Sequence, residues 1–352
     1  MCVTTMQSSI KILCDEYSTI IDESYFNSRS VNIVESFDDI KDSLKPFIDE
    51  TNIAISLSGG VDSMVLLDAL SRHTEAKIFA FHLNYNNRIE SRDEAEFLKK
   101  YCKELGVHLF IDEIDDMNRL TTNRDLYERE TRRRRFQNYR YMIAKHHCRG
   151  IHLGHHSGDV VENIFTNVLK NIHHNDLSVL KQTNVIDEVR INRPFINLSK
   201  ARLIRYASAN DIPYFKDTTP LWSCRGQMRN EIFPKLEKCF GIQFAQNLMN
   251  FDAERSSTNK LVNELMKPYT SYLKVGHLIQ LNVSIGHTMN MPIEFWMFVY
   301  DKLCENMKIK YFSRKSIKNF FENKDRLQTI VMSCDCILRI RGIYDFLEVE
   351  MK

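Results

Sequence analysis

The chain has 352 residues, 43% of them hydrophobic, so it can bury a large core and is long enough for two domains. Its 48 basic residues nearly balance its 46 acidic ones, and no stretch approaches the roughly 20 apolar residues of a membrane-spanning helix. Nine cysteines without a CxxC pair, and a start without a secretory signal, argue against a secreted disulfide-rich protein and predict a cytoplasmic one with no membrane span.

Alternating strands and helices are predicted for residues 41–220, after an N-terminal extension at residues 1–40 with weak periodicity. The expected strands are residues 53–58, 77–84, 108–114 and 150–156. The expected helices follow them at residues 62–73, 91–106, 129–147 and 158–172. A shorter helix, kinked near Pro46, precedes the first strand. This alternation indicates an α/β domain with a doubly wound, mainly parallel sheet and ligands at the carboxyl ends of its strands.

The pattern changes after residue 220. Residues 221–352 are expected to form a helical connector and a smaller α+β C-terminal domain. Helices are predicted at residues 293–307 and 313–323, and strands at residues 328–334, 336–341 and 344–350. A hydrophobic stripe in the first of these helices is interpreted as core, at Phe295, Trp296, Phe298 and Val299. A basic surface that would bind a nucleic-acid backbone without sequence choice is predicted from Lys308, Lys310, Arg314, Lys315 and Lys318.

The turn between the first expected strand and its helix reads Ser58-Gly59-Gly60-Val61-Asp62-Ser63. Glycines let the main chain approach an anion closely, and a helix start offers unpaired N–H donors and the positive end of a dipole. The turn is therefore suited to hold phosphate. It is neither a Gly-Lys-Ser/Thr P-loop nor a G-x-G-x-x-G dinucleotide turn. The simpler alternative is an ordinary turn in which Asp62 or Ser63 caps the helix.

This hexapeptide resembles the S-G-G-x-D-S signature of the PP-loop ATP pyrophosphatases, and four later blocks resemble the tRNA(Ile)-lysidine synthetases among them. The first block is a strand end and turn, matched at His82, Asn84, Arg88 and Ser91. Tyr85 stands where the family usually has a histidine. The second block is a helix, matched at Arg132, Arg135 and Phe136, whose arginines could pair with nucleotide or tRNA phosphates. The alternatives are a core histidine at His82 and a solvated helix face.

The third block runs from a strand end into a helix and is matched at His155, His156, Asp159 and Glu162. The two carboxylates share one helix face, and because like charges repel, a cationic partner would stabilise them. The resemblance implies that this partner is the substrate lysine. A solvated helix start that favours acids through its dipole is the alternative. Gly158 and Asn163 depart from the family pattern.

The fourth block is matched in order at Pro194, Lys200, Tyr206, Asp217, Arg225, Arg229 and Pro234. Arg225 and Arg229 lie one helical turn apart and are predicted to bind phosphate of ATP, of the adenylated intermediate or of RNA. A surface salt-bridge pair is the alternative. Thr219-Pro220 replaces a family Ser-Asn, and Gly226 replaces Asn.

The resemblance, over residues 50–240, implies ATP-dependent ligation of L-lysine to the wobble cytidine of an isoleucine tRNA with a CAU anticodon, through an adenylated cytidine. ATP with Mg²⁺ would be bound by Ser58, Gly59, Gly60, Val61, Asp62, Ser63 and His82. Catalysis would rest on Asp62, Asp159, Glu162, Arg225 and Arg229, with lysine held by Asp159 and Glu162. Arg132, Arg135, Arg225 and Arg229 would contact phosphates, and no protein metal site is assigned.

Three alternative functions stay open. A tRNA thiolase of the 2-thiocytidine branch would usually carry CxxC pairs, which are absent here. A non-catalytic RNA-binding homologue would fit the departures at Tyr85, Gly158 and Gly226. An amidotransferase-type synthetase would leave the C-terminal domain unexplained. The sequence does not decide the oligomeric state, for which a homodimer is one expectation.

Overall fold

A computed structural model describes residues 3–28, 35–117, 121–170, 177–270, 272–275, 278–281, 291–307, 312–323, 329–333, 336–341 and 346–351. The chain divides into two units, residues 1–252 and 253–352. The boundary lies inside helix α11 (Phe244–Thr270), not near residue 220 as the sequence predicts.

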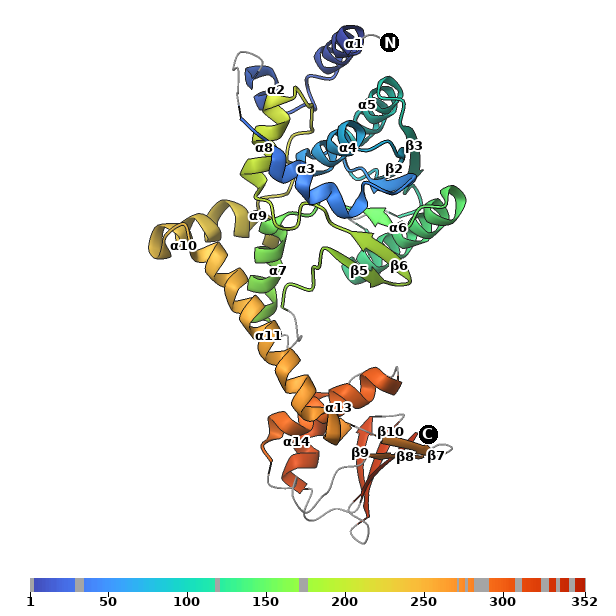
Figure 1. Cartoon of the computed structure of the whole chain (residues 1–352), viewed down its shortest axis with the longest axis vertical. Coiled ribbons are helices and arrows are strands. Elements are labelled where there is room, and N and C mark those ends of the chain that lie inside the picture. The colour runs from blue at the N-terminus through green and yellow to red at the C-terminus, as the bar shows by residue number, and fades with distance from the viewer. Residues whose placement is uncertain are drawn as a thin grey trace. The chain divides into compact units, whose positions relative to one another are not determined.

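The first unit is built on a six-stranded sheet with the order β3-β2-β1-β4-β6-β5 (Figure 1). Its strands are β1 (Asn52–Ser56), β2 (Lys77–Asn84), β3 (His108–Glu113), β4 (Ile151–His152), β5 (Thr183–Ile186) and β6 (Val189–Asn192). Five strands run parallel, and β5 is antiparallel to β6 at the edge. This confirms the α/β class and the mainly parallel sheet. The strand order reverses between β1 and β4, which makes the carboxyl end of β1 the expected ligand site.

Helices cover both faces of this sheet. One face carries α3 (Asp38–Leu44), α4 (Val61–His73), α5 (Ser91–Glu104) and α8 (Lys200–Ala209), and the other carries α6 (Arg124–His146). The residues of β1 explain the arrangement: Ile53 and Ile55 belong to the first core, and Ala54 between them belongs to the second. A strand buried on both faces reads as a continuous apolar run because its side chains alternate between two cores. Pro46 lies in a short 3-10 turn, η1 (Lys45–Phe47), directly after α3.

The N-terminal segment is part of the first unit and not a separate extension. Helix α1 (Val3–Glu16) packs on α5, and α2 (Glu23–Ser28) packs on α8. Ile10, Leu13 and Cys14 of α1 are buried in the same core as β1 and α4. The sequence expectation failed because α1 covers the core with only a few apolar residues on one side, a pattern too weak to recognise.

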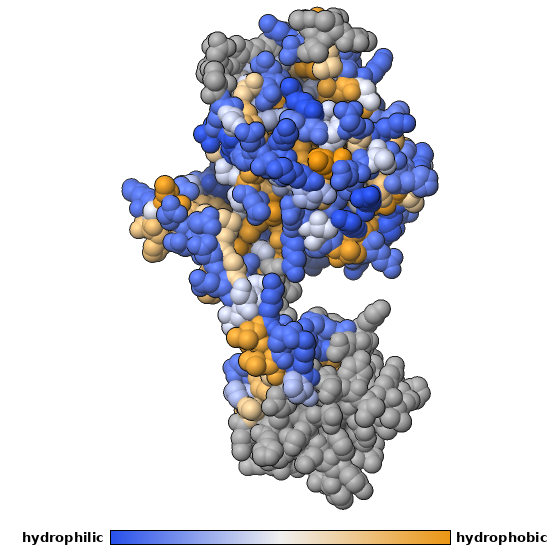
Figure 2. All heavy atoms as spheres, viewed as in Figure 1, coloured by the Kyte–Doolittle hydropathy of each residue, from blue (hydrophilic) through white to orange (hydrophobic). Residues whose placement is uncertain are grey.

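The remaining elements of the first unit are α7 (Ser157–Leu169), α9 (Cys224–Gln227), the π-turn η2 (Met228–Ile232), α10 (Phe233–Phe240) and the start of α11, up to residue 252. Its visible surface is mainly hydrophilic, interrupted by small hydrophobic patches (Figure 2). Within the described ranges, no helix is both long and apolar enough to cross a membrane.

The second unit contains an antiparallel sheet with the order β7-β8-β11-β10-β9 and two further helices. The elements are β7 (Tyr272–Val275), β8 (Leu278–Leu281), α13 (Ile293–Met307), α14 (Arg314–Asn323), β9 (Thr329–Ser333), β10 (Cys336–Arg341) and β11 (Phe346–Met351). Trp296 and Val299 are fully buried, as expected of a core stripe. Arg314, Lys315 and Lys318 are exposed on α14, while Lys308 and Lys310 lie outside the described residues.

Candidate functional site

The glycine turn lies at the carboxyl end of β1, at the point where the strand order reverses. Gly59 has φ +82°, and a Cβ there would lie 2.0 Å from the Phe215 ring, so only glycine fits. The N-cap of α4 is Gly60, without a side-chain hydrogen bond, so neither Asp62 nor Ser63 is the capping residue. Ser63 instead braces the turn: its Oγ accepts from the Ser58 N–H at 3.2 Å and donates to the Gly60 carbonyl at 3.0 Å.

A second glycine, Gly154, lies against the first turn of α4, although no sequence motif pointed to it. A Cβ on Gly154 would lie 2.7 Å from the main-chain carbonyl of Asp62. Residue 154 therefore has to be glycine, because any side chain would prevent the loop after β4 from packing against the glycine turn at residues 58–63. The only sequence signal was its place directly before His155 and His156.

The carboxylate of Asp62 lies at the site and has one buried oxygen without a hydrogen-bond partner. Its carboxylate lies 3.7 Å from His156 Nε2 and 3.8 Å from Lys200 Nζ. Its Oδ1 is buried and accepts no hydrogen bond. Burial raises the pKa of Asp62 above its ordinary value, although His156 and Lys200 partly oppose this shift. An orphaned carboxylate oxygen of this kind is a good partner for a cation.

Asp159 lies near Asp62 and completes the capping box of α7. His156 is the N-cap of α7, its Nδ1 accepts from the Gly158 N–H at 2.9 Å, and Asp159 accepts from the His156 N–H at 3.1 Å. Burial opposes ionisation of Asp159, but the charge and the N–H of His156 outweigh it, and the pKa is lowered. Asp159 is therefore an ionised carboxylate that already stabilises the start of α7.

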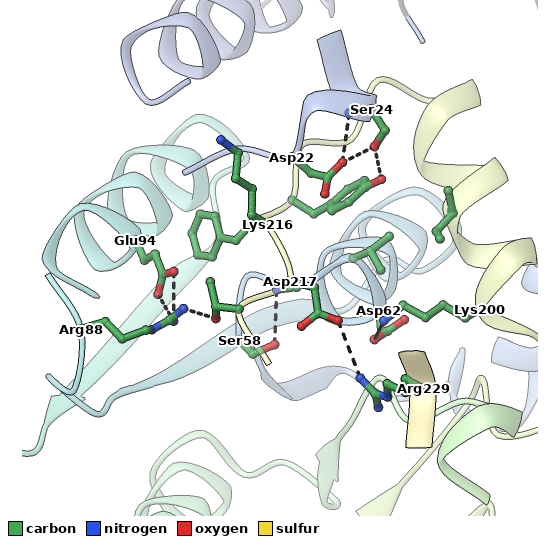
Figure 3. A pocket seen from close by; sticks show the side chains of 16 residues that line it. Asp22, Ser24, Ser58, Asp62, Arg88, Glu94, Lys200, Lys216, Asp217 and Arg229 are labelled. Atoms are coloured by element: carbon green, nitrogen blue, oxygen red, sulfur yellow. Dashed lines mark hydrogen bonds and ion pairs between the residues drawn. The ribbon is translucent and has the colours of Figure 1, made fainter. Parts of the chain in front are cut away.

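Glu162, one turn further along α7, is bound by both predicted arginines. Arg229 donates from Nε to its Oε1, and Arg225 Nε lies 3.3 Å from its Oε2. The Arg229 guanidinium also lies 3.6 Å from Asp159 and 3.9 Å from Asp217, the latter pair visible in Figure 3. The acidic pair and the basic pair, to which the sequence analysis assigned different ligands, thus form one cluster.

Two departures from the family pattern fit this local structure. A Cβ on Gly226 would lie 2.2 Å from the Pro220 carbonyl oxygen, so a family asparagine would collide with the turn before α9. A Cβ on Gly158 would lie 2.7 Å from the His156 ring. Both glycines allow close packing around the acid–arginine cluster.

A cavity of about 540 Å³ opens beside the turn (Figure 3). It is lined by Asp22, Ser24, Ser58, Gly60, Val61, Asp62, Arg88, Glu94, Lys200, Ile204, Tyr214, Phe215, Lys216, Asp217, Thr218 and Arg229. Asp22 and Ser24 come from the N-terminal segment, and no sequence signal pointed to them. They reach the site because the Asp22 N–H donates to the Tyr214 carbonyl at 2.9 Å and Ser24 Oγ shares a hydrogen bond with the Tyr214 hydroxyl.

A smaller cavity of about 240 Å³ lies at the carboxyl ends of β1 and β2 and shares Ser58, Arg88 and Glu94 with the first. His82 Nδ1 donates to the Leu57 carbonyl at 2.8 Å, and burial lowers the pKa of His82. Two buried donors on this wall, Asn84 Nδ2 and Arg135 Nε, have no hydrogen-bond partner. The cavity therefore suits a ligand with acceptor atoms.

Arg132 does not join Arg135 at the cavity. Its guanidinium lies 3.0 Å from Asp187 and 4.6 Å from the centre of the Phe136 ring, and its side chain is half exposed. His155 also lies back from the cavities. Arg193, which is 2% exposed, donates from Nε to His155 Nδ1 at 3.1 Å, and burial lowers the pKa of His155 to about 4.

The donor set bears on the expected Mg²⁺. Among the described residues, no group of three or more His, Cys, Asp and Glu side chains forms a ready-made metal site. Mg²⁺ commonly binds through one or two carboxylates together with substrate phosphates. The oxygen of Asp62 that has no hydrogen-bond partner lies beside the glycine turn and could bind Mg²⁺ in this way. Asp62 thus fits as the residue that would hold the ion once a nucleotide is present.

Comparison with known proteins identifies the domain that carries this turn. The PP-loop domain profile matches residues 32–236. A tRNA(Ile)-lysidine synthase of Chlamydia felis is 30% identical over 222 residues, which are 62% of this chain and 69% of the relative. One of Staphylococcus epidermidis is 27% identical over 186 residues, 52% of this chain and 42% of the relative. Among solved structures, the U34-tRNA thiolase NcsA of Methanococcus maripaludis aligns with a TM-score of 0.51 at 18% identity, over 62% of this chain and 78% of that chain, which shows a shared fold.

Proposed function

The chain belongs to the tRNA(Ile)-lysidine synthase family of PP-loop ATP pyrophosphatases, and from this premise we propose that it ligates L-lysine to the wobble cytidine of an isoleucine tRNA with a CAU anticodon. ATP is split to AMP and diphosphate in the reaction, which we place in the cytoplasm. The observation that carries the proposal is the turn at Gly59 and Gly60, which opens on a cavity beside the free carboxylate oxygen of Asp62.

In the first step, the C2 carbonyl oxygen of the cytidine attacks the α-phosphate of ATP and diphosphate leaves. The main-chain N–H groups at the mouth of α4 bind the diphosphate, and Lys200 and Arg229 on the cavity wall offset its charge. Magnesium held through Asp62 would neutralise part of the negative charge that develops on the phosphates. The adenosine fits the smaller cavity, where Asn84 and Arg135 offer unpaired donors.

In the second step, the lysine ε-amine displaces AMP from C2. Asp159 and Glu162 are bound to Arg225 and Arg229, so the amine needs these acids to change partners. We propose that the arginines turn to the phosphate of the adenylated cytidine, which frees the carboxylates for the ammonium of lysine. One carboxylate then accepts the proton that the amine must lose before it attacks.

Purified full-length protein incubated with labelled lysine, ATP and bulk tRNA tests the proposal. Label is expected in RNA that has been deacylated and precipitated with acid, and ATP–diphosphate exchange is expected only when tRNA is added. Asp62→Ala should abolish both signals, whereas Asp93→Ala, at an exposed acid on α5, should leave them unchanged. Wild-type protein that leaves the RNA unlabelled would contradict the proposed function.

A further inference from the structure

Two apolar side chains stand exposed in the segment between the cavity and the arginine pair. Leu221 is 68% exposed and Trp222 is 73% exposed. Burying an indole ring gains a large amount of apolar area, so its exposure beside a functional site needs a reason. The other tryptophan of the chain, Trp296, is fully buried in the second unit.

The segment that carries Trp222 is held by hydrogen bonds. The Ser223 N–H donates to the Pro220 carbonyl at 2.9 Å, and Ser223 Oγ accepts from the Gly226 N–H at 3.0 Å as the cap of α9. Gly226 also lets the Pro220 carbonyl lie against α9, because a Cβ there would approach it to 2.2 Å. The indole is therefore presented on a fixed turn.

An arginine follows closely in the same segment. Trp222 comes three residues before Arg225, so their Cα atoms lie within ~11 Å of each other. The Arg225 side chain is 58% exposed although its Nε lies near Glu162. An exposed aromatic ring with an exposed arginine close by is a usual arrangement for binding single-stranded nucleic acid.

We propose that Trp222 stacks on an unpaired nucleobase of the RNA substrate next to the reacting cytidine, while Arg225 contacts the adjoining phosphate. The inference rests on the proposed function and adds a base-stacking residue to it. Every base has a π face, so Trp222 contributes affinity and positioning without sequence choice. It lies outside both cavities, so ATP binding does not depend on it.

Tryptophan fluorescence, excited selectively over tyrosine, tests this directly, because the chain has only two tryptophans and Trp296 is buried in the other unit. The probe is an RNA stem-loop with CAU in its loop, added to the full-length protein. Stacking should quench the wild-type emission, and Trp222→Ala should remove the quench and weaken RNA binding roughly 5- to 100-fold. Trp222→Phe keeps a stacking face and should retain most of the affinity. Leu221→Ala, the matched control, should change it far less.

The outcomes separate the two proposals. Trp222→Ala protein that binds the stem-loop as tightly as wild type would overturn the stacking role alone. So would a change in oligomeric state caused by Trp222→Ala, since it would assign the exposed indole to a protein contact. Wild-type protein that binds ATP but no RNA would overturn the proposed function together with this inference.

Discussion

Arg229 donates a hydrogen bond from Nε to Oε1 of Glu162, so an arginine expected to bind phosphate holds the acid expected to bind the amine, 67 residues away in sequence. Glu162 is 4% exposed, and its second oxygen faces Arg225 at 3.3 Å. The pairing stabilises both charges in the apo protein and leaves them able to exchange partners when substrates arrive.

Glu162→Gln should therefore destabilise the first unit as well as impair catalysis. Removing one partner of a buried ion pair is destabilising, and although Asp159 and Asp217 still face Arg229, the free energy of unfolding should fall by up to about 3 kcal/mol. Urea denaturation measures the loss, and Glu231→Gln, at an exposed acid on η2, should show none. Adenylation should persist in Glu162→Gln while lysine transfer slows. Equal loss of both steps would contradict the division of roles between Asp62 and Glu162.

Gly226→Asn, which restores the family residue, should lower stability. The new Cβ would lie 2.2 Å from the Pro220 carbonyl, and overpacking of this kind typically costs about 1–3 kcal/mol. Thermal unfolding measures the change, with Gln227→Asn on the exposed side of α9 as the control. A Gly226→Asn protein as stable as wild type would show that the turn at Pro220 does not constrain this position.

Asp62→Asn should stabilise the folded protein while abolishing adenylation. Burial raises the pKa of Asp62, so its ionisation opposes folding: the penalty begins as the pH rises above the ordinary pKa of aspartate and is complete above the raised one. The amide removes this penalty at neutral pH, and the difference from wild type should vanish in acid, where Asp62 is protonated. Denaturation midpoints at neutral and acidic pH test both parts. A less stable variant at neutral pH would show that the attraction of His156 and Lys200 outweighs burial.

His152 should make the fold sensitive to acid. It is fully buried, Nδ1 donates to the Ala54 carbonyl at 3.1 Å, Nε2 accepts from Asn192 at 3.2 Å, and burial lowers its pKa to about 4. Its contribution to stability is complete above pH ~6.5 and is lost as the pH falls towards ~4, a total of about 3 kcal/mol. The loss between these pH values should be smaller in His152→Gln. His147→Asn, at an exposed helix end, should behave as wild type.

Ser24→Ala should weaken the cavity wall that the N-terminal segment provides. The hydroxyl links Asp22 to Tyr214, and the neighbouring Phe215 N–H donates to the Gly59 carbonyl at 2.9 Å. Losing this link should raise the KM for ATP several-fold with little change in kcat, and lower stability by about 1 kcal/mol. Glu23→Gln, exposed in the same segment, is the control. An unchanged KM would mean that the wall does not position the turn.

The central strands and their helices could be predicted because each carries a strong apolar pattern. The β5–β6 hairpin could not, since its strands have four residues each and its turn uses Asp187 and Glu188 at positive φ instead of the usual Asn-Gly. Helix α8 was recognised only as a motif around Lys200 and Tyr206. The N-terminal helices were missed because their contribution to the core becomes evident only when they pack on α5 and α8.

In the candidate site, too, features set by a local run of residues could be predicted and features set by long-range contacts could not. The turn at Gly59 could be predicted, because a local run of residues determines its geometry. The contacts of Asp22, Gly154 and the Glu162–Arg229 pair could not, since each joins segments far apart in the chain and depends on how the loops meet. Arg132 and Arg135 lie three residues apart on one helix, yet only Arg135 lines a cavity, because Asp187 binds the other.

The most direct test of the account is a crystal structure of the full chain with a non-hydrolysable ATP analogue and Mg²⁺. The account predicts the β- and γ-phosphates against the main-chain N–H groups at Gly59 and Gly60, with Asp62 beside the ion. A structure in which the analogue is bound elsewhere while this turn contacts no phosphate would contradict it.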